Sequence, residues 1–230
     1  MAAAFNYEQE LATLLIGFYG TGVIKIDTEK GFELAAHRRD PTLPRSPTYF
    51  NLRTTTHPTN PGRLTPSEVN VIARLMYERL TQTKIEFDGL CGVPDAGVPF
   101  ARALQEHYYN LDRRDVPLLT LKKGNGLKKT QGLPRGSRVL LIDDVVSDAG
   151  SKVREGIEPL RLERYIVRDC IVCIDREQGG AAQLERPSVK VGLCSIVSAS
   201  EVFDLYERAR IILPEVREKL RHYHATSCAA

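Results

Sequence analysis

One stretch of fifteen residues, RVLLIDDVVSDAGSK at 138–152, constrains the fold of this chain more than any other. Its four consecutive apolar residues, 139–142, are typical of a strand buried on both faces of a parallel sheet. Two adjacent carboxylates follow, Asp143 and Asp144, and then a turn of small residues at 147–151, after which a helix is expected. The sequence therefore predicts an acidic pair and a small-residue turn at the carboxyl edge of a parallel sheet.

These groups match the chemistry of a sugar phosphate. Carboxylates accept hydrogen bonds from sugar hydroxyls, and the free N–H groups of a turn that enters a helix bind phosphate. The alternative interpretation is a buried strand that ends in a solvated acidic turn. Because the acidic pair and the turn occur together at this spacing, we favour the sugar-phosphate site.

The bulk properties place the chain in a broad class. Its 230 residues are enough for one α/β domain with a small appendage, and 32 basic against 29 acidic residues indicate no polyanionic partner. No helix-turn-helix or basic recognition helix is visible, so we expect no nucleic-acid partner. Five cysteines without a secretory signal favour the reducing cytoplasm, and no apolar run approaches the length of a membrane span.

The first 64 residues are expected to form a cap. A helix at 6–19 precedes two short strands, GVIKI and GFELAA, which we expect to pair as a hairpin through 27–31. A loop rich in proline and arginine follows, ending in SPTYFNLR. The residues of Thr65–Glu68 form a capping box for a helix that runs to about residue 82.

The remaining residues, 65–230, are expected to form the core. Besides the strand that begins at 139–142, the pattern predicts strands at 85–91, 116–121, 169–174 and 190–196. Helices are expected between the strands, and two helices at the end. This order predicts a doubly wound, mostly parallel α/β sheet with the N-terminal cap over its carboxyl edge. A basic loop, with six basic and no acidic residues between 122 and 138, follows the second of these strands.

The motifs SPTYFNLR, GLCGVPDAGVPFARAL, LTLKK, VLLIDDVVSDAGS, CIDREQGG and VGLCSIVSASEVFDLY occur in this order along the chain. Together they resemble the orotate phosphoribosyltransferase family, a branch of the type I phosphoribosyltransferases. The resemblance implies magnesium-dependent transfer of phosphoribose from 5-phosphoribosyl-1-pyrophosphate (PRPP) to orotate, giving orotidine 5′-monophosphate and pyrophosphate. It also implies a homodimer in which the basic loop of one subunit closes over the site of the other, and magnesium held mainly by PRPP, with no protein metal ligand.

The resemblance also assigns roles to residues by motif. The PRPP-binding residues it implies are Asp143 and Asp144 for the ribose, Ser147, Asp148, Ala149, Gly150 and Ser151 for the 5′-phosphate, and Asp95, Ala96, Gly97, Lys122 and Lys123 for the pyrophosphate. The orotate-binding residues it implies are Tyr49, Phe50 and Arg176, and the catalytic residues are Lys123, Lys128 and Asp144.

The phosphate turn departs from the family pattern at two positions. Asp148 adds a negative charge near the expected phosphate, and Ala149 replaces a glycine where the backbone is expected to need positive φ. If Asp148 points at the anion, it weakens the site; if it points to solvent or lies over an arginine, little changes. Ala96 stands at a position that the family varies.

The basic loop and the acceptor side depart as well. The loop lacks the family's histidine, so that Lys128 or Lys129 would have to supply its charge. Ala35 stands where an acceptor-side lysine is expected, and the arginines of the following loop, Arg38, Arg39 and Arg45, are the candidates to replace it. Two alternatives therefore stay open: a phosphoribosyltransferase for another nucleobase, and a PRPP-binding regulatory protein with little turnover.

Overall fold

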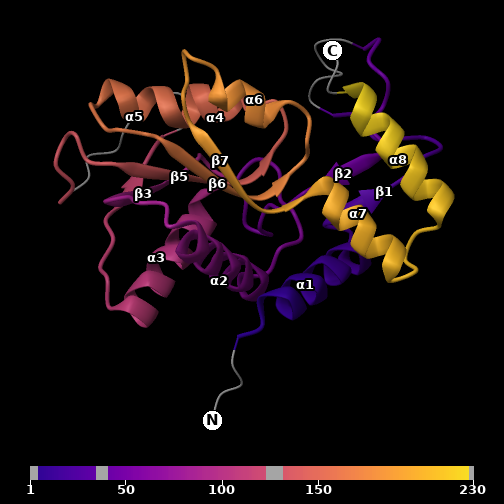
Figure 1. The fold of residues 1–230 in the computed structure, drawn as a ribbon, viewed down its shortest axis with the longest axis horizontal. Coiled ribbons are helices and arrows are strands. Elements are labelled where there is room, and N and C mark those ends of the chain that lie inside the picture. Colours follow the sequence, from indigo (N-terminus) through magenta and orange to yellow (C-terminus); the bar gives the residue numbers. More distant parts are fainter. Residues whose placement is uncertain (1–4, 35–40, 123–131, 228–230) are drawn as a thin grey trace.

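The computed structural model describes residues 5–34, 41–122 and 132–227, and its centre is a parallel sheet of five strands (Figure 1). The strand order is β4-β3-β5-β6-β7. The strands are β3 (Gly89–Gly92), β4 (Leu118–Thr120), β5 (Val139–Val146), β6 (Asp169–Asp175) and β7 (Gly192–Ser198). The predicted doubly wound α/β fold is confirmed, and β5, which carries the acidic pair, is its central strand.

Helices cover both faces of this sheet. One face is covered by α2 (Pro66–Thr83) and α3 (Val98–Asp112), and the other by α4 (Gly150–Lys152), a π-helical turn η2 (Val153–Ile157), α5 (Glu158–Leu162) and α6 (Gly180–Glu185). Successive residues of a strand point to opposite faces. Accordingly, Leu140 packs in the core beneath α2 and α3, whereas Leu141 packs in the core beneath α5 and α6.

Local signals set the helix starts where the sequence predicts them. The Thr65 hydroxyl accepts a hydrogen bond from the Glu68 backbone N–H at 3.3 Å, and the Thr65 N–H donates to the Glu68 carboxylate at 2.7 Å. This is the predicted capping box of α2. Ser198 and Glu201 form a second capping box, which begins α7 (Ala199–Arg208).

The N-terminal region contains α1 (Tyr7–Thr21) and a separate two-stranded sheet of β1 (Ile24–Ile26) and β2 (Thr48–Phe50). The predicted hairpin through 27–31 is wrong, because β1 pairs antiparallel with β2. Of the described part of the expected second strand, only Phe32 forms a bridge, and its partner is Ser46. The chain turns at 27–31 as expected but pairs with a more distant segment.

The N-terminal helix α1 packs against the C-terminal part of the chain. α7 and the last helix, α8 (Pro214–Ser227), lie next to β1 and β2 (Figure 1). The Tyr206 hydroxyl of α7 donates to the Leu15 carbonyl of α1 at 2.7 Å. One hydrophobic cluster runs from α1 through α2 to α7, across the predicted boundary at residue 64, and that boundary stays a prediction. Within the described ranges, no helix combines the length and the apolar character needed to cross a membrane.

Candidate active site

The first carboxylate of the acidic pair, Asp143, is enclosed within the protein. Asp143 is buried, and its Oδ2 lies 2.7 Å from Nζ of Lys152, which is buried as well. Its Oδ1 accepts the backbone N–H of Asp144 at 2.9 Å. Both carboxylate oxygens therefore have partners inside the protein. The ribose contact assigned to Asp143 stays a prediction.

The second carboxylate is more accessible. Asp144 is half-buried, and its Oδ1 accepts the Val145 N–H at 2.7 Å. Burial and the neighbouring charge of Asp143 raise its pKa to about 7, although Lys152 and Arg53 oppose the rise. Arg53 follows β2, so the N-terminal region brings a guanidinium group to the acidic pair.

The predicted phosphate turn follows the end of β5. Ala149 adopts the left-handed conformation with φ of 58°, as the glycine preference at this position predicts. Asp148 is exposed, and its carboxylate accepts the N–H of Gly150 at 3.0 Å. One N–H group of the turn is thus already engaged by an acidic side chain. Ser147 is half-buried and Ser151 is exposed.

The predicted pyrophosphate turn follows β3, next to β5. The Val93 N–H donates to the Ile142 carbonyl of β5 at 2.9 Å, and the Gly97 N–H donates to the Val93 carbonyl at 2.9 Å. A Cβ atom at Gly97 would lie 2.1 Å from the Ile142 carbonyl oxygen, so only glycine fits. The turn holds Asp95 and Ala96 half-buried beside the end of β5, and the Pro94–Asp95 peptide bond is cis.

Several predicted residues of the basic loop and the acceptor side cannot be placed. Lys122, two residues after the end of β4, is exposed, and so is Arg45. The remaining residues of this group lie outside the described residues: Lys123, Lys128, Lys129, Ala35, Arg38 and Arg39.

The predicted orotate residue Arg176 lies in the turn after β6. Its backbone N–H donates to the Val146 carbonyl at 2.9 Å, which ties this turn to the end of β5. The side chain is buried, with Nη2 3.3 Å from the Ser46 hydroxyl and Cζ 5.4 Å from the centre of the Phe50 ring. Burial lowers the pKa of Arg176, and its Nε has no hydrogen-bond partner among the described residues. A buried cation with an unused donor is suited to an anionic ligand.

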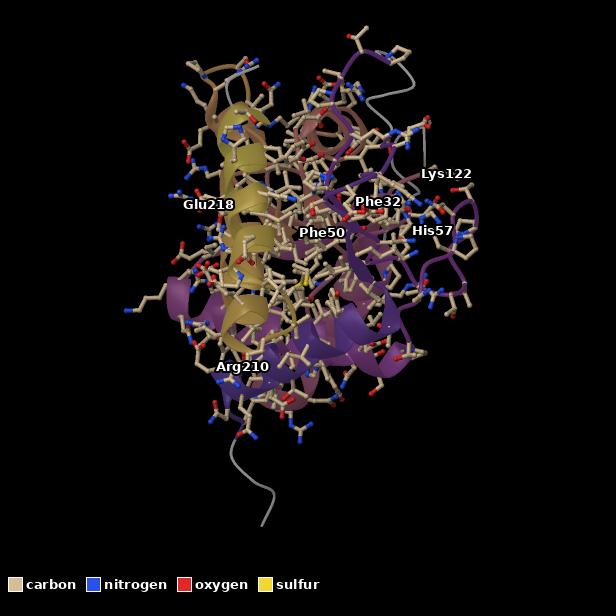
Figure 2. All side chains as sticks on the ribbon, turned by 90° about the vertical axis from the view of Figure 1, so that its right-hand side faces the viewer. Phe32, Phe50, His57, Lys122, Arg210 and Glu218 are labelled. Atoms are coloured by element: carbon tan, nitrogen blue, oxygen red, sulfur yellow. The ribbon has the colours of Figure 1, made fainter. Side chains whose placement is uncertain are left out.

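The two predicted aromatic residues have different neighbours because adjacent strand residues point to opposite faces. The ring of Tyr49 lies 5.8 Å from that of Phe32, between centroids, while the ring of Phe50 lies 6.2 Å from that of Phe203. Of these two aromatic residues, Phe50 is the one that contacts Arg176. Figure 2 shows Phe50 and Phe32, the ring neighbour of Tyr49, as separate side chains in this region.

The structure adds residues that the sequence analysis did not single out. Besides Lys152 and Arg53, it places His224 of α8 near Arg176, where burial lowers the pKa of the imidazole while the charge of Glu177 raises it. Neither ring nitrogen forms a hydrogen bond with the described residues. The signal for its burial is its position four residues after the buried Leu220, on the same face of a helix.

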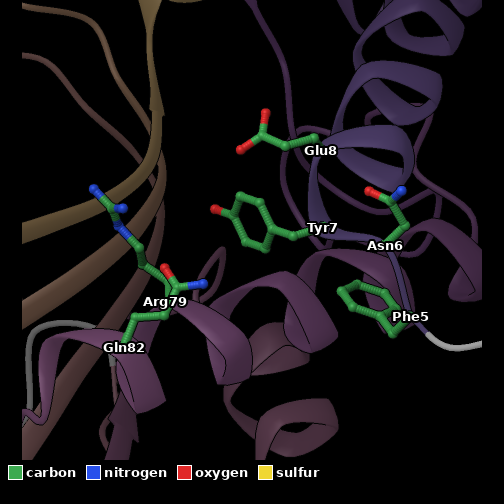
Figure 3. Close-up of a pocket in the computed structure, with 6 residues that line it drawn as sticks. All are labelled: Phe5, Asn6, Tyr7, Glu8, Arg79 and Gln82. Atoms are coloured by element: carbon green, nitrogen blue, oxygen red, sulfur yellow. The ribbon is translucent and has the colours of Figure 1, made fainter.

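A cavity of about 570 Å³ lies elsewhere, between the start of α1 and the last turns of α2 (Figure 3). Its lining residues are Phe5, Asn6, Tyr7, Glu8, Arg79 and Gln82. Because α2 ends shortly before β3 begins, this cavity is near the amino edge of the sheet. It does not include any residue of the acidic pair or of the turns around it.

Comparison with known proteins identifies relatives of the chain. No family model matches it. Orotate phosphoribosyltransferase of Cenarchaeum symbiosum is 31% identical over 182 residues, which cover 76% of this chain and 84% of that protein. Uridine 5′-monophosphate synthase of Bos taurus is 31% identical over 187 residues, covering 77% of this chain. The crystal structure of orotate phosphoribosyltransferase from Aeropyrum pernix, 25% identical, superimposes with a TM-score of 0.61 over 84% of this chain and 97% of that one.

The matched lengths differ among these relatives. The chain spans 35% of the length of the Bos taurus protein and 66% of an orotate phosphoribosyltransferase of Caenorhabditis elegans. It spans most of the archaeal protein, at an identity that establishes common descent. Together with the fold and the motifs at the carboxyl edge of the sheet, this match shows that the chain belongs to the orotate phosphoribosyltransferase family.

Proposed function

We propose that this chain transfers the 5-phosphoribosyl group of PRPP to orotate, giving orotidine 5′-monophosphate and pyrophosphate. The observation that carries the proposal is the convergence of three elements at one edge of the sheet: the acidic pair, the glycine-locked turn after β3 and the turn of Arg176. Family membership at 31% identity supports the same reaction. A solved neighbour, orotate phosphoribosyltransferase of Mycobacterium tuberculosis, is described in complex with PRPP.

The proposed chemistry is the replacement of one bond at C1 of the ribose. The bond from C1 to the pyrophosphate oxygen breaks, and pyrophosphate leaves with the bonding electrons. A bond from C1 to a ring nitrogen of orotate forms, and the proton of that nitrogen is released to solvent or to the leaving pyrophosphate. Positive charge develops on the sugar during this step, and preorganised groups stabilise such charge separation. In this scheme Asp144 accepts hydrogen bonds from the ribose hydroxyls, and the backbone of 95–97 binds the pyrophosphate.

Arg176 is proposed to recognise the acceptor. Its guanidinium group, buried against Phe50 and Ser46, has an unsatisfied Nε that would pair with the carboxylate of orotate. A neutral base such as uracil offers no carboxylate, so the buried cation would remain unpaired. The site should therefore favour orotate over bases that lack a carboxylate.

Magnesium and dimerisation are further parts of the proposal. The described residues contain no group of three or more histidine, cysteine or acidic side chains suited to a metal. Magnesium commonly binds through substrate phosphates and retains water ligands, so the ion would arrive with PRPP and neutralise charge on its pyrophosphate. We also propose a homodimer in which the basic loop of each subunit closes over the site of the other. To test this, two inactive variants with complementary defects are mixed, and recovery of activity in the mixture is measured.

The test is product analysis with a panel of acceptors. The protein is incubated with PRPP, magnesium and either orotate, uracil, adenine or no base, and nucleotides are separated by chromatography. We expect orotidine 5′-monophosphate with orotate and little product with the other bases. A nucleotide formed from another base instead would show a different acceptor.

One observation, the position of Asp148, supports a second candidate function. Asp148 already engages the Gly150 N–H of the phosphate turn, which favours weaker PRPP binding and fits a PRPP-binding regulatory protein with little turnover. Binding of PRPP without product from any base would support that function. Product formation with orotate would exclude it as the main role.

A further inference from the structure

Lys152 is a buried lysine inside the PRPP motif. It follows the phosphate turn at the end of α4, and the residue is 4% exposed. Its Nζ lies 2.7 Å from Oδ2 of Asp143 and donates to the Val145 carbonyl at 2.5 Å. One ammonium group thus links the start of the helix to the end of β5, on both sides of Asp144.

This arrangement has a clear electrostatic purpose. Two adjacent carboxylates at a buried strand end repel one another, and the proposed substrate, PRPP, is itself an anion. A buried ammonium needs a partner charge and hydrogen-bond acceptors, and here Asp143 and Val145 supply them. The pair Lys152–Asp143 is therefore close to neutral as a unit, and Asp144 carries the remaining negative charge.

We propose that Lys152 is a positioning residue for PRPP: it neutralises Asp143 and fixes the end of β5, so that Asp144 is the carboxylate that binds the ribose. The inference rests on the proposed function and deepens it. It differs from the family-based expectation, in which both carboxylates contact the ribose directly. The difference is testable because it assigns Asp143 and Lys152 to a support that a neutral pair can replace.

The charged and titratable groups around this pair come from four elements. Asp143 and Asp144 belong to β5, Lys152 to α4, Cys170 and Cys173 to β6, and Arg53 to the segment after β2. Although burial lowers the pKa of Lys152, Asp143 and Asp144 raise it above its ordinary value overall. Burial raises the pKa of both thiols, so the cysteines stay neutral near pH 7. Loss of the ammonium should therefore raise the pKa of Asp144 further.

The first experiment needs no substrate. Carboxyl carbons are followed by NMR during a pH titration of the ligand-free protein, with Asp144→Asn used to assign the Asp144 signal. In Lys152→Met, we expect the Asp144 midpoint to rise by about one pH unit, the size typical of removing a charge at this range. The exposed Lys219→Met serves as the control and should leave the midpoint unchanged. An unchanged midpoint in Lys152→Met would overturn the electrostatic part of the proposal.

The second experiment measures PRPP binding by calorimetry at pH 7.5. We expect Lys152→Met to bind about tenfold or more weakly, because the acidic pair loses its counter-charge. In the double variant Asp143→Asn/Lys152→Met, which restores neutrality with uncharged groups of similar size, binding should return to within about threefold of the wild type. Circular dichroism and thermal unfolding of each variant show whether it is folded.

The outcomes separate the two assignments. A folded double variant that stays as weak as Lys152→Met would show that Asp143 itself binds the ribose, and the proposal would be wrong. If Lys152→Met binds as tightly as the wild type, the proposal fails as well. Failure of the wild-type protein to bind PRPP would instead refute the proposed function, while the titration would still test the charge arrangement.

Discussion

Replacing Asp144 by asparagine should make the protein more stable and, at the same time, a weaker binder of PRPP. The reason is that the folded protein raises the pKa of this carboxyl from 3.8 to about 7, chiefly through burial and the charge of Asp143. Ionised Asp144 therefore destabilises the folded state, although the same ionised carboxylate is the form that accepts hydrogen bonds from the ribose. Asparagine keeps the shape and removes the charge.

The sign and size of the stability change in Asp144→Asn follow from the linkage between protonation and folding. Well below pH 3.8 the carboxyl is neutral in both the folded and unfolded states, so the substitution gains nothing there. The cost of ionised Asp144 grows as pH rises from 3.8 and reaches its maximum above about pH 7. The full shift corresponds to about 4 kcal/mol, and solvent screening of a half-buried group reduces this to about 1–2 kcal/mol. For a chain of this size, that gain is about 2–8 °C in Tm at pH 8.

Asp143→Asn is the matched control, because it removes the adjacent carboxylate and should have the opposite effect. It leaves the buried Lys152 without its anion, and breaking such a pair costs about 3–5 kcal/mol. At pH 8 the Tm should therefore be higher than that of the wild type for Asp144→Asn and lower for Asp143→Asn. Equal shifts in both variants would refute the assignment of distinct roles to the two carboxylates.

The affinity of Asp144→Asn for PRPP is the second measurement in this test. Loss of charge-assisted hydrogen bonds to the ribose should weaken PRPP by about 1.5–3 kcal/mol, or roughly 10- to 150-fold in Kd. Calorimetry at pH 6 and pH 8 should show a gain in wild-type affinity at the higher pH that exceeds the gain in Asp144→Asn, because only the wild type ionises this carboxyl. Unchanged PRPP affinity in a folded Asp144→Asn protein would show that Asp144 does not bind the ribose.

Three further substitutions test other parts of the site. Asp148→Ala should tighten PRPP binding by about 3- to 10-fold at low salt, since a like charge beside the phosphate is removed; weaker binding in calorimetry would contradict this. Gly97→Ala should destabilise the protein by about 2–3 kcal/mol in denaturant unfolding, because a Cβ 2.1 Å from the Ile142 carbonyl oxygen forces the turn to move; native stability would show that the turn is not fixed by this contact. Arg176→Met should raise the KM for orotate about tenfold or more and leave the Kd for PRPP within about twofold, since it loses a charge-assisted bond to the acceptor only; equal loss for both substrates in steady-state kinetics and calorimetry would contradict that role.

The core of the fold follows from local patterns in the sequence. The apolar run before Asp143 predicts the central strand, and the capping box at Thr65–Glu68 predicts the start of α2, because neighbouring residues make both interactions. The pairing of β1 was not predictable in the same way. Its partner β2 lies more than twenty positions downstream, and alternation alone does not identify which extended segment a short strand joins.

Prediction of the site from the sequence was incomplete as well, because some of its contacts join residues on different elements. The motif at 143–151 indicates a sugar-phosphate site, but a lysine at the start of a helix is typical of a solvent-facing position. Its burial against Asp143 is visible only once the helix packs on β5. His224 likewise approaches Arg176 because α8 folds back over the turn after β6, a contact between segments that are 48 positions apart.

The most direct test of the proposed transfer reaction is pyrophosphate release from PRPP and magnesium, measured with orotate and without any base. We expect release that depends on orotate and is lost or strongly reduced in Asp144→Asn, which remains folded. Release without orotate at the same rate, or none with orotate while PRPP still binds, would contradict the proposed transfer reaction.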